Sequence, residues 1–277
     1  MRMDENTLEQ RLKDYTFFHT IQLGDGIQTP GKPISRHQEI VLETIAAQDL
    51  AGKRVIDIGC ANGLFALAAE KQGATDILAV DHTESQLEPL RELLIPYLES
   101  KIKVSQQNLL ELRASEIGQF DLVIFPGVLY HLRYPFWSLK IVRDLTAEGG
   151  LLIIETSVIV DENELAVLWC PSPSDSPYTG RGANACSFFN RKALEETLAC
   201  LGIEVISLRH SQRANVRKIR QVRRILSRLK QTVVRTMKWK TSQSQGPSPT
   251  LDRVVLLCRR KAELADPQLQ NFYDGLS

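Results

Sequence analysis

Residues 55–63 read VIDIGCANG, an apolar run that opens into a loop between Gly59 and Gly63, with one acid at Asp57. A buried strand that turns directly into a helix in this way brings backbone N–H groups and the helix N-terminus close to a ligand. The spacing fits neither G-x-G-x-x-G nor a phosphate loop with its lysine, so phosphate binding is disfavoured. A carboxylate at Asp57 suits a cationic amino group. We therefore expect the loop to hold an adenosine that carries an amino acid.

Strand-like and helix-like stretches alternate from about residue 38 onward, which is typical of a parallel sheet wrapped by helices. Strands are expected at 54–58, 77–80, 102–105, 121–125, 151–155, 203–207 and 253–258. Helices are expected at 37–48, 63–72, 85–98, 136–145 and 190–201. The predicted fold class is α/β, with a doubly wound, Rossmann-like sheet of seven strands.

The chain divides into three parts in this reading. Residues 1–50 form an N-terminal flap and helix, residues 51–262 the main domain, and residues 263–277 a C-terminal tail. Within the main domain, the loop 157–187 is rich in Pro, Ser and Gly and is expected to lack regular structure. A basic insertion covers 209–250. The flap is interpreted as a lid over the active site.

Composition excludes several classes of protein. Hydrophobic residues make up 43% of the 277 residues and charged residues 24%, and no apolar run approaches the roughly 20 residues that span a bilayer. The polar, acidic start does not resemble a signal peptide, so a cytoplasmic location is expected. The five cysteines form no C-x-x-C pair, so neither a metal site nor a disulfide framework is predicted.

Further candidate ligand contacts follow the later strands. Asp81 ends the second strand, where an acid can accept both ribose hydroxyls, although a nicotinamide dinucleotide would want the same acid. Asn108 follows the third strand and could contact the adenine amino group or simply belong to a surface turn. The predicted cofactor-binding set is Asp57, Gly59, Cys60, Ala61, Gly63, Asp81, His82, Asn108 and Gly127.

Together, the VIDIGCANG loop, Asp81 and the FDLVIF strand at 120–125 resemble the class I S-adenosylmethionine-dependent methyltransferases. The resemblance covers roughly residues 38–160 and the last two strands. It implies a seven-stranded sheet whose last strand is antiparallel, with the cofactor across the C-terminal ends of the first strands.

A closer resemblance involves FFHTIQLGDGIQTPG at 17–31, the segment 127–156 and SFFNRKALEETLACLGIEV at 187–205. These stretches look like the branch that includes the tRNA wobble-uridine carboxymethyltransferase, a branch that also contains methyltransferases of small molecules and sugars. The tRNA enzyme is implied to hold the extra anion of its carboxylated cofactor with a lysine, a tyrosine and an arginine. Tyr130 matches the tyrosine, but the K-G-P-F stretch with the lysine is absent, and Lys13 does not match it. S-adenosyl-L-methionine is therefore expected in preference to carboxy-S-adenosyl-L-methionine.

Candidate catalytic residues lie just after the fourth strand. Methyl transfer from a sulfonium is an in-line displacement, so much of the catalysis can come from positioning. If the acceptor is a hydroxyl, His131 is the predicted general base, with Tyr130 beside it. Both have structural alternatives, a loop hydrogen bond for the histidine and a pocket wall for the tyrosine. The predicted substrate contacts are His19, Arg181 and Arg217.

The segment from Arg209 to Lys240 contains twelve Lys and Arg residues and no Asp or Glu. Its apolar residues recur at helical spacing, so one basic face and one apolar face are expected. A solvated helix packed on the domain would explain this pattern, and so would binding to tRNA, to an anionic membrane surface or to an anionic small substrate. Because the segment follows the sixth strand, it is expected to border the substrate mouth.

The sequence thus predicts a methyltransferase that uses S-adenosyl-L-methionine, acting on an oxygen of a small or anionic acceptor. One alternative is carboxymethyl transfer to the wobble uridine of tRNA. Another is a catalytically silent Rossmann-like binding module. The intact loop residues Asp57, Gly59 and Gly63, together with Asp81, argue against the silent module.

Overall fold

The computed structural model describes residues 5–24, 26–161, 165–172, 176, 185–211 and 249–261. The predicted basic helix 213–240, the tail 263–277 and the candidate substrate residues Arg181 and Arg217 lie outside these residues.

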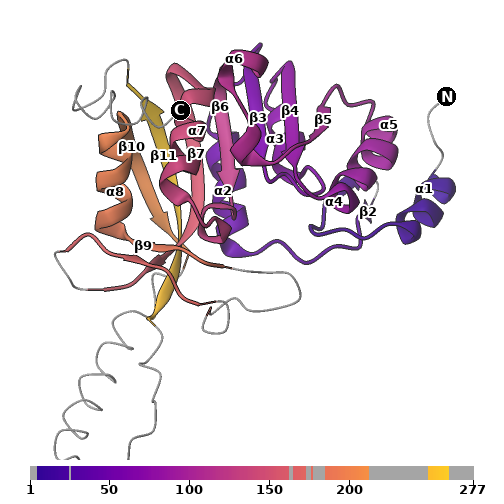
Figure 1. Cartoon of the computed structure of the whole chain (residues 1–277). Coiled ribbons are helices and arrows are strands. Elements are labelled where there is room, and N and C mark those ends of the chain that lie inside the picture. Colours follow the sequence, from indigo (N-terminus) through magenta and orange to yellow (C-terminus); the bar gives the residue numbers. More distant parts are fainter. Residues whose placement is uncertain are drawn as a thin grey trace, which may run out of the picture.

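A single central sheet organises the chain (Figure 1). Along its main path the strands follow the order β10-β11-β7-β6-β3-β4-β5. Their bounds are β3 Arg54–Ile58, β4 Asp76–Asp81, β5 Lys103–Gln106, β6 Phe120–Pro126, β7 Thr146–Ile159, β10 Ile203–His210 and β11 Leu251–Arg260. Strands β3 to β7 are parallel, and β11 runs antiparallel to both β7 and β10. The predicted α/β class and the antiparallel last strand are confirmed.

Two short strands add to this path and correct the sequence-based expectation. β9 (Phe188–Asn190) pairs in parallel with the end of β7, and β8 (Leu168–Trp169) pairs with β9, so the sheet has nine strands within the described residues. The count of seven is therefore not confirmed. The expectation of no regular structure over 157–187 is wrong at β8 and at the end of β7. Strands of two or three residues are too short to show an alternating pattern, and β7 offers them backbone partners because it extends past β6.

Helices cover both faces of the sheet. α2 (Arg36–Ala46), α3 (Leu64–Lys71) and the run from α4 (Glu84–Pro89) through a π-helical turn to α5 (Ile95–Leu98) pack on one face. α7 (Pro135–Leu145) and α8 (Arg191–Cys200) pack on the other, and the short α6 is Ala114–Ile117. All five predicted helices are present at these positions. Among the described residues, no helix is long and apolar enough to cross a bilayer.

The N-terminal segment is built into the main core. It comprises α1 (Glu5–Arg11), one 3-10 turn, and a hairpin of β1 (Gln22–Gly24) and β2 (Ile27–Gln28). Phe17 and Ile21 are buried and belong to the same hydrophobic cluster as residues of α2 and α3. Burial of these side chains fixes the flap against the domain, and its role as a lid stays a prediction.

Candidate functional site

A cavity of about 830 Å³ opens at the C-terminal ends of the parallel strands, where ligands of open α/β sheets bind. Most of the predicted site residues line it: His19, Gly59, Ala61, Asp81, His82, Asn108, Gly127, Tyr130 and His131. The structure does not bring Asp57, Cys60 or Gly63 to the cavity wall. Sequence reasoning missed His37, Glu155 and Arg253, which also line the cavity.

The backbone of the glycine loop bonds mainly to its own neighbourhood. The N–H groups of Gly59 and Cys60 both donate to Val80 O, at 2.8 and 3.1 Å, and Ala61 N–H donates to Asp81 Oδ2 at 3.1 Å. These N–H groups therefore do not face a ligand, contrary to expectation. The finding agrees with the prediction that the loop is no phosphate cradle.

Gly59 is required where the loop meets the turn after β6. Its φ of +74° lies in the left-handed region, and a Cβ there would lie 2.3 Å from Cγ2 of Val128. Ala61 also has a positive φ, of 46°. The glycine loop is thus tightly packed, and it forms one wall of the cavity without filling it.

Asp57 lies behind the loop. Its side chain is fully buried, and Oδ2 accepts the N–H of Ala66 in α3 at 3.0 Å. Burial raises the pKa of Asp57 to about 8, the Ala66 hydrogen bond lowers it, and the charge of Asp81 raises it. The carboxyl is therefore mostly neutral at pH 7. Asp57 holds the first turn of α3 in place, and this geometry does not bring it to an amino group in the cavity.

Asp81 is the acid next to the glycine loop that lines the cavity. Its Oδ1 accepts the N–H of Thr83 at 2.9 Å and its Oδ2 accepts the N–H of Ala61. Each carboxylate oxygen has a second acceptor site, so two hydroxyls of a ligand can still bind. Asn108 lines the same region, and its Oδ1 accepts the N–H of Leu110 at 3.0 Å. Asn108 is therefore both a turn residue and a cavity residue.

A buried polar cluster forms at another part of the cavity. Arg253 donates two hydrogen bonds of 2.5 Å to Glu155 and one of 2.9 Å to the hydroxyl of Tyr130. Its guanidinium also lies over the Tyr130 ring, 4.6 Å from the centroid. Burial acts to lower the pKa of Arg253, but the hydrogen bonds and charge of Glu155, with Tyr130, raise it above its usual value. Arg253 is thus a permanent cation that orients the tyrosine.

The register of β7 and β11 creates this cluster. Glu155 faces Val255 and Arg253 faces Ser157, so the acid and the arginine are diagonal neighbours across two antiparallel strands. The sequence contained one signal for this pair. The predicted strand LLIIE ends with Glu155, and the predicted strand RVVLLC begins with Arg253.

The turn that carries Tyr130 and His131 is held by the segment before β9. Tyr130 O accepts N–H groups from Cys186 at 2.8 Å and Ser187 at 3.2 Å, and the Cys186 thiol donates to His131 O at 3.1 Å. The two rings of Tyr130 and His131 lie 4.2 Å apart. The position of both side chains therefore depends on residues at the end of the loop 157–187.

Asn62 joins the flap to the glycine loop. Its side chain is fully buried, its Oδ1 accepts the N–H of Phe18, and its Nδ2 donates to Gln86 O at 2.9 Å. The flap, the loop and α4 are thereby connected through one side chain. The sequence analysis gave this residue no role.

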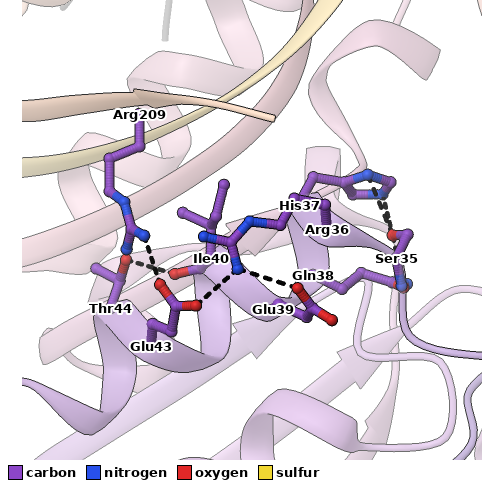
Figure 2. A network of polar contacts seen from close by, with 9 residues as sticks. All are labelled: Ser35, Arg36, His37, Gln38, Glu39, Ile40, Glu43, Thr44 and Arg209. Atoms are coloured by element: carbon purple, nitrogen blue, oxygen red, sulfur yellow. Dashed lines mark hydrogen bonds and ion pairs between the residues drawn. The ribbon is translucent and has the colours of Figure 1, made fainter. Parts of the chain in front are cut away.

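Glu43 on the outer face of α2 connects this helix to the end of β10 (Figure 2). Glu43 pairs with Arg36 at 2.7 Å and with Arg209, and these hydrogen bonds lower its pKa. Arg209 is the first residue of the basic insertion, and His37 in the first turn of α2 lines the cavity. The first residue of the insertion therefore contacts the helix whose first turn borders the cavity, and the expectation that the insertion borders the substrate mouth stays a prediction. Within the described ranges, no group of three or more His, Cys, Asp or Glu is arranged to hold a metal ion.

Comparison with known proteins agrees with the fold. The methyltransferase domain family matches residues 35–208. The tRNA U34 carboxymethyltransferase of Methylococcus capsulatus is 35% identical over 118 residues, which cover 42% of this chain and 36% of the relative. The ubiquinone biosynthesis O-methyltransferase of Escherichia coli O157:H7 is 33% identical over 129 residues, which cover 45% of this chain and 52% of that protein. The matches span about a third to a half of these relatives' lengths.

Solved structures show the same architecture over nearly the whole chain. The N-terminal domain of EvdMO1, crystallised with SAH and D-fucose, has a TM-score of 0.61 at 18% identity, covering 94% of this chain and 98% of that one. The Burkholderia thailandensis 1,6-didemethyltoxoflavin-N1-methyltransferase has a TM-score of 0.53 at 16% identity, covering 82% of this chain and 78% of that one. With the family match over more than half of its length, the chain belongs to the methyltransferase domain family, within the class I S-adenosylmethionine-dependent methyltransferases.

Proposed function

We propose that this protein transfers a methyl group from S-adenosyl-L-methionine to an oxygen atom of a small or anionic acceptor. The observation that carries the proposal is one cavity with two chemically different regions, Asp81 in one and the Tyr130–Arg253–Glu155 cluster in the other. A volume of about 830 Å³ lies within the range of about 300–1,000 Å³ that is usual for small-molecule and cofactor sites.

The chain's own residues fit the adenosine part of the cofactor. Asp81 has acceptor capacity left for the ribose hydroxyls, and Asn108 borders the space beside it. Gly59, Ala61 and Gly127 form walls without bulky side chains, so the ligand can lie against backbone. When bound, S-adenosyl-L-methionine supplies an electrophilic methyl group on a sulfonium.

At the acceptor side, Tyr130 and His131 are the proposed reaction residues. Arg253 donates a hydrogen bond to the Tyr130 hydroxyl, so the tyrosine oxygen accepts that bond and is held at a fixed position on the acceptor side of the cavity. His131 is proposed to take the proton from an acceptor hydroxyl. The name of the Escherichia coli relative, an O-methyltransferase, supports an oxygen acceptor.

The charge balance favours the plain cofactor over its carboxylated form. Of the cavity-lining residues in the described part, Arg253 is the single lysine or arginine, and Glu155 neutralises it with two hydrogen bonds. Burial lowers the pKa of His19 to about 4, so this imidazole is neutral as well. An additional carboxylate would find no uncompensated cation among these side chains.

Carboxymethyl transfer to tRNA is the second candidate. It is supported by the names of several relatives and by the contact between Tyr130 and Arg253, the two residue types implied to hold the extra anion. Mass spectrometry of the ligand retained on purification separates the two candidates. S-adenosyl-L-methionine or its homocysteine product supports the first, and the carboxylated cofactor supports the second. Retention of an unrelated ligand, such as a dinucleotide, would contradict both.

The basic insertion is proposed to recruit an anionic partner, either tRNA or an anionic membrane surface, in the cytoplasm. Its charge and the attachment of Arg209 to α2 beside the cavity support this role. The test replaces five arginines together with glutamine: Arg217, Arg220, Arg223, Arg224 and Arg228. If the wild type binds tRNA with an affinity that falls steeply with salt and the variant does not, the partner is tRNA. If the wild type sediments with anionic vesicles and the variant does not, the partner is a membrane surface. Wild-type protein that binds neither would refute recruitment.

A further inference from the structure

His19 has an unusual environment for a flap residue. It lines the cavity, yet only 5% of its surface is exposed, and Nδ1 has no hydrogen-bond partner among the described residues. Leaving a buried polar atom without a partner costs about 1–3 kcal/mol, so such atoms are uncommon unless a ligand or water completes the site. Packing alone therefore does not explain why the imidazole is buried here with an Nδ1 that is unpaired within the described part of the chain.

The backbone around His19 is fixed on both sides. Lys32 N–H donates to Phe18 O at 3.1 Å, and Thr20 N–H donates to Lys32 O at 3.0 Å. The Thr29 hydroxyl donates to His19 O at 2.6 Å. Gly31 also packs against that carbonyl, so closely that a Cβ would lie 2.1 Å from the oxygen. The backbone that carries the imidazole is consequently held in one place.

The ring is also held next to the glycine loop. It packs at 4.8 Å from the Phe18 ring and at 5.8 Å from Phe65 of α3, which follows the loop. The N–H of Phe18 donates to Asn62 inside the loop. His19 therefore meets the cavity at the α3 side of the loop, whereas Asn108, which marks the side proposed for adenine, follows β5.

We propose that His19 is a positioning residue that hydrogen-bonds the amino-acid end of the nucleoside donor. This inference rests on the proposed function, because it assumes that an adenosine with an amino acid binds in the cavity. Burial, followed by the charge of His37, keeps the imidazole neutral by lowering its pKa, so the ring offers one N–H donor and one acceptor. A zwitterionic amino acid has a carboxylate for the donor and an ammonium for the acceptor.

The experiment compares two probes that differ only in their amino-acid end. S-adenosylhomocysteine carries the amino acid, and 5′-methylthioadenosine lacks it. His19→Phe keeps a ring between Phe18 and Phe65 but removes both nitrogens. Calorimetry should show that S-adenosylhomocysteine binds about ten- to hundredfold more weakly to this variant, while the affinity for methylthioadenosine changes less than about twofold.

Two further variants control the comparison. Gln28→Ala changes an exposed residue of the same flap and should leave both affinities unchanged. His19→Asn restores a polar group and should recover part of the lost affinity. Nitrogen-detected NMR should show the His19 signals of the wild type shifting with S-adenosylhomocysteine and not with methylthioadenosine.

Equal weakening of both probes by His19→Phe, or no weakening of either, overturns the inference. So does an absent NMR shift. These outcomes differ from failure of the proposed function, in which the wild-type protein itself binds neither probe.

Discussion

The Glu155–Arg253 pair offers the sharpest test of the site's construction. Glu155→Gln keeps the shape of the side chain and removes its charge. Glu155 is 1% exposed and the Arg253 side chain 16%, so the guanidinium would stay buried without its counter-charge. One of the two short hydrogen bonds would also meet an amide group that cannot accept it.

Breaking a buried pair by removing one partner costs about 3–5 kcal/mol. For a domain of this size each kcal/mol lowers Tm by roughly 2–4 °C, so the expected fall is roughly 6–20 °C. In urea denaturation, the free energy of unfolding of the variant should be lower than that of the wild type by the same amount, about 3–5 kcal/mol. The double variant Glu155→Gln with Arg253→Gln should recover part of the loss, because no uncompensated charge is then buried.

Glu39→Gln is the matched control, because it removes the same charge from an exposed pair. Glu39 lies 3.0 Å from Arg36 on the outside of α2, where both side chains are 49% exposed (Figure 2). A surface pair of this kind contributes about 0–1 kcal/mol. If Glu155→Gln destabilises the protein no more than Glu39→Gln does, the buried cluster does not stabilise the site as argued here.

Three other substitutions have defined outcomes. Gly59→Ala should lower the free energy of unfolding by about 1–3 kcal/mol, because the new Cβ meets Val128 at a positive φ; unchanged denaturation would contradict the loop geometry. Asp57 has a folded-state pKa of about 8 against an ordinary 3.8, so the folded state holds its proton more tightly and stability should fall as pH rises from about 4 through 8. Asp57→Asn should flatten this slope in denaturation curves between about pH 4 and about pH 8, and an unchanged slope would refute the assignment. Asn62→Ala should cost about 1–3 kcal/mol and speed hydrogen exchange at Phe18 N–H, whereas unaltered exchange would show that the flap is held by other contacts.

Local pattern was enough to predict the main path of the sheet. The predicted strand 54–58 coincides with β3, because a buried parallel strand is a continuous apolar run bounded by polar turns. The predicted strand 203–207 falls within β10, an edge strand that pairs antiparallel with β11. The antiparallel last strand came from the resemblance and is confirmed. β8 and β9 could not be predicted, because their pairing depends on how far β7 extends.

The site was harder to predict where it depends on the direction in which a side chain points or on the register of two strands. Asp57 shares its strand face with Val55, toward α3, so the alternation of the strand turns it away from the cavity. The partnership of Glu155 with Arg253 joins residues 98 positions apart, and a one-residue change of register would place them on opposite faces. Asp81 was found because a strand-end acid needs no long-range information.

The most direct test of the central claim is calorimetric titration of the purified protein with S-adenosyl-L-methionine, in the wild type and in Asp81→Ala. We expect one binding site per protein chain, with an affinity about tenfold or more weaker when the Asp81 carboxylate, which is proposed to bind the ribose hydroxyls, is lost. No binding to the wild type, or equal affinity in the two proteins, would contradict it.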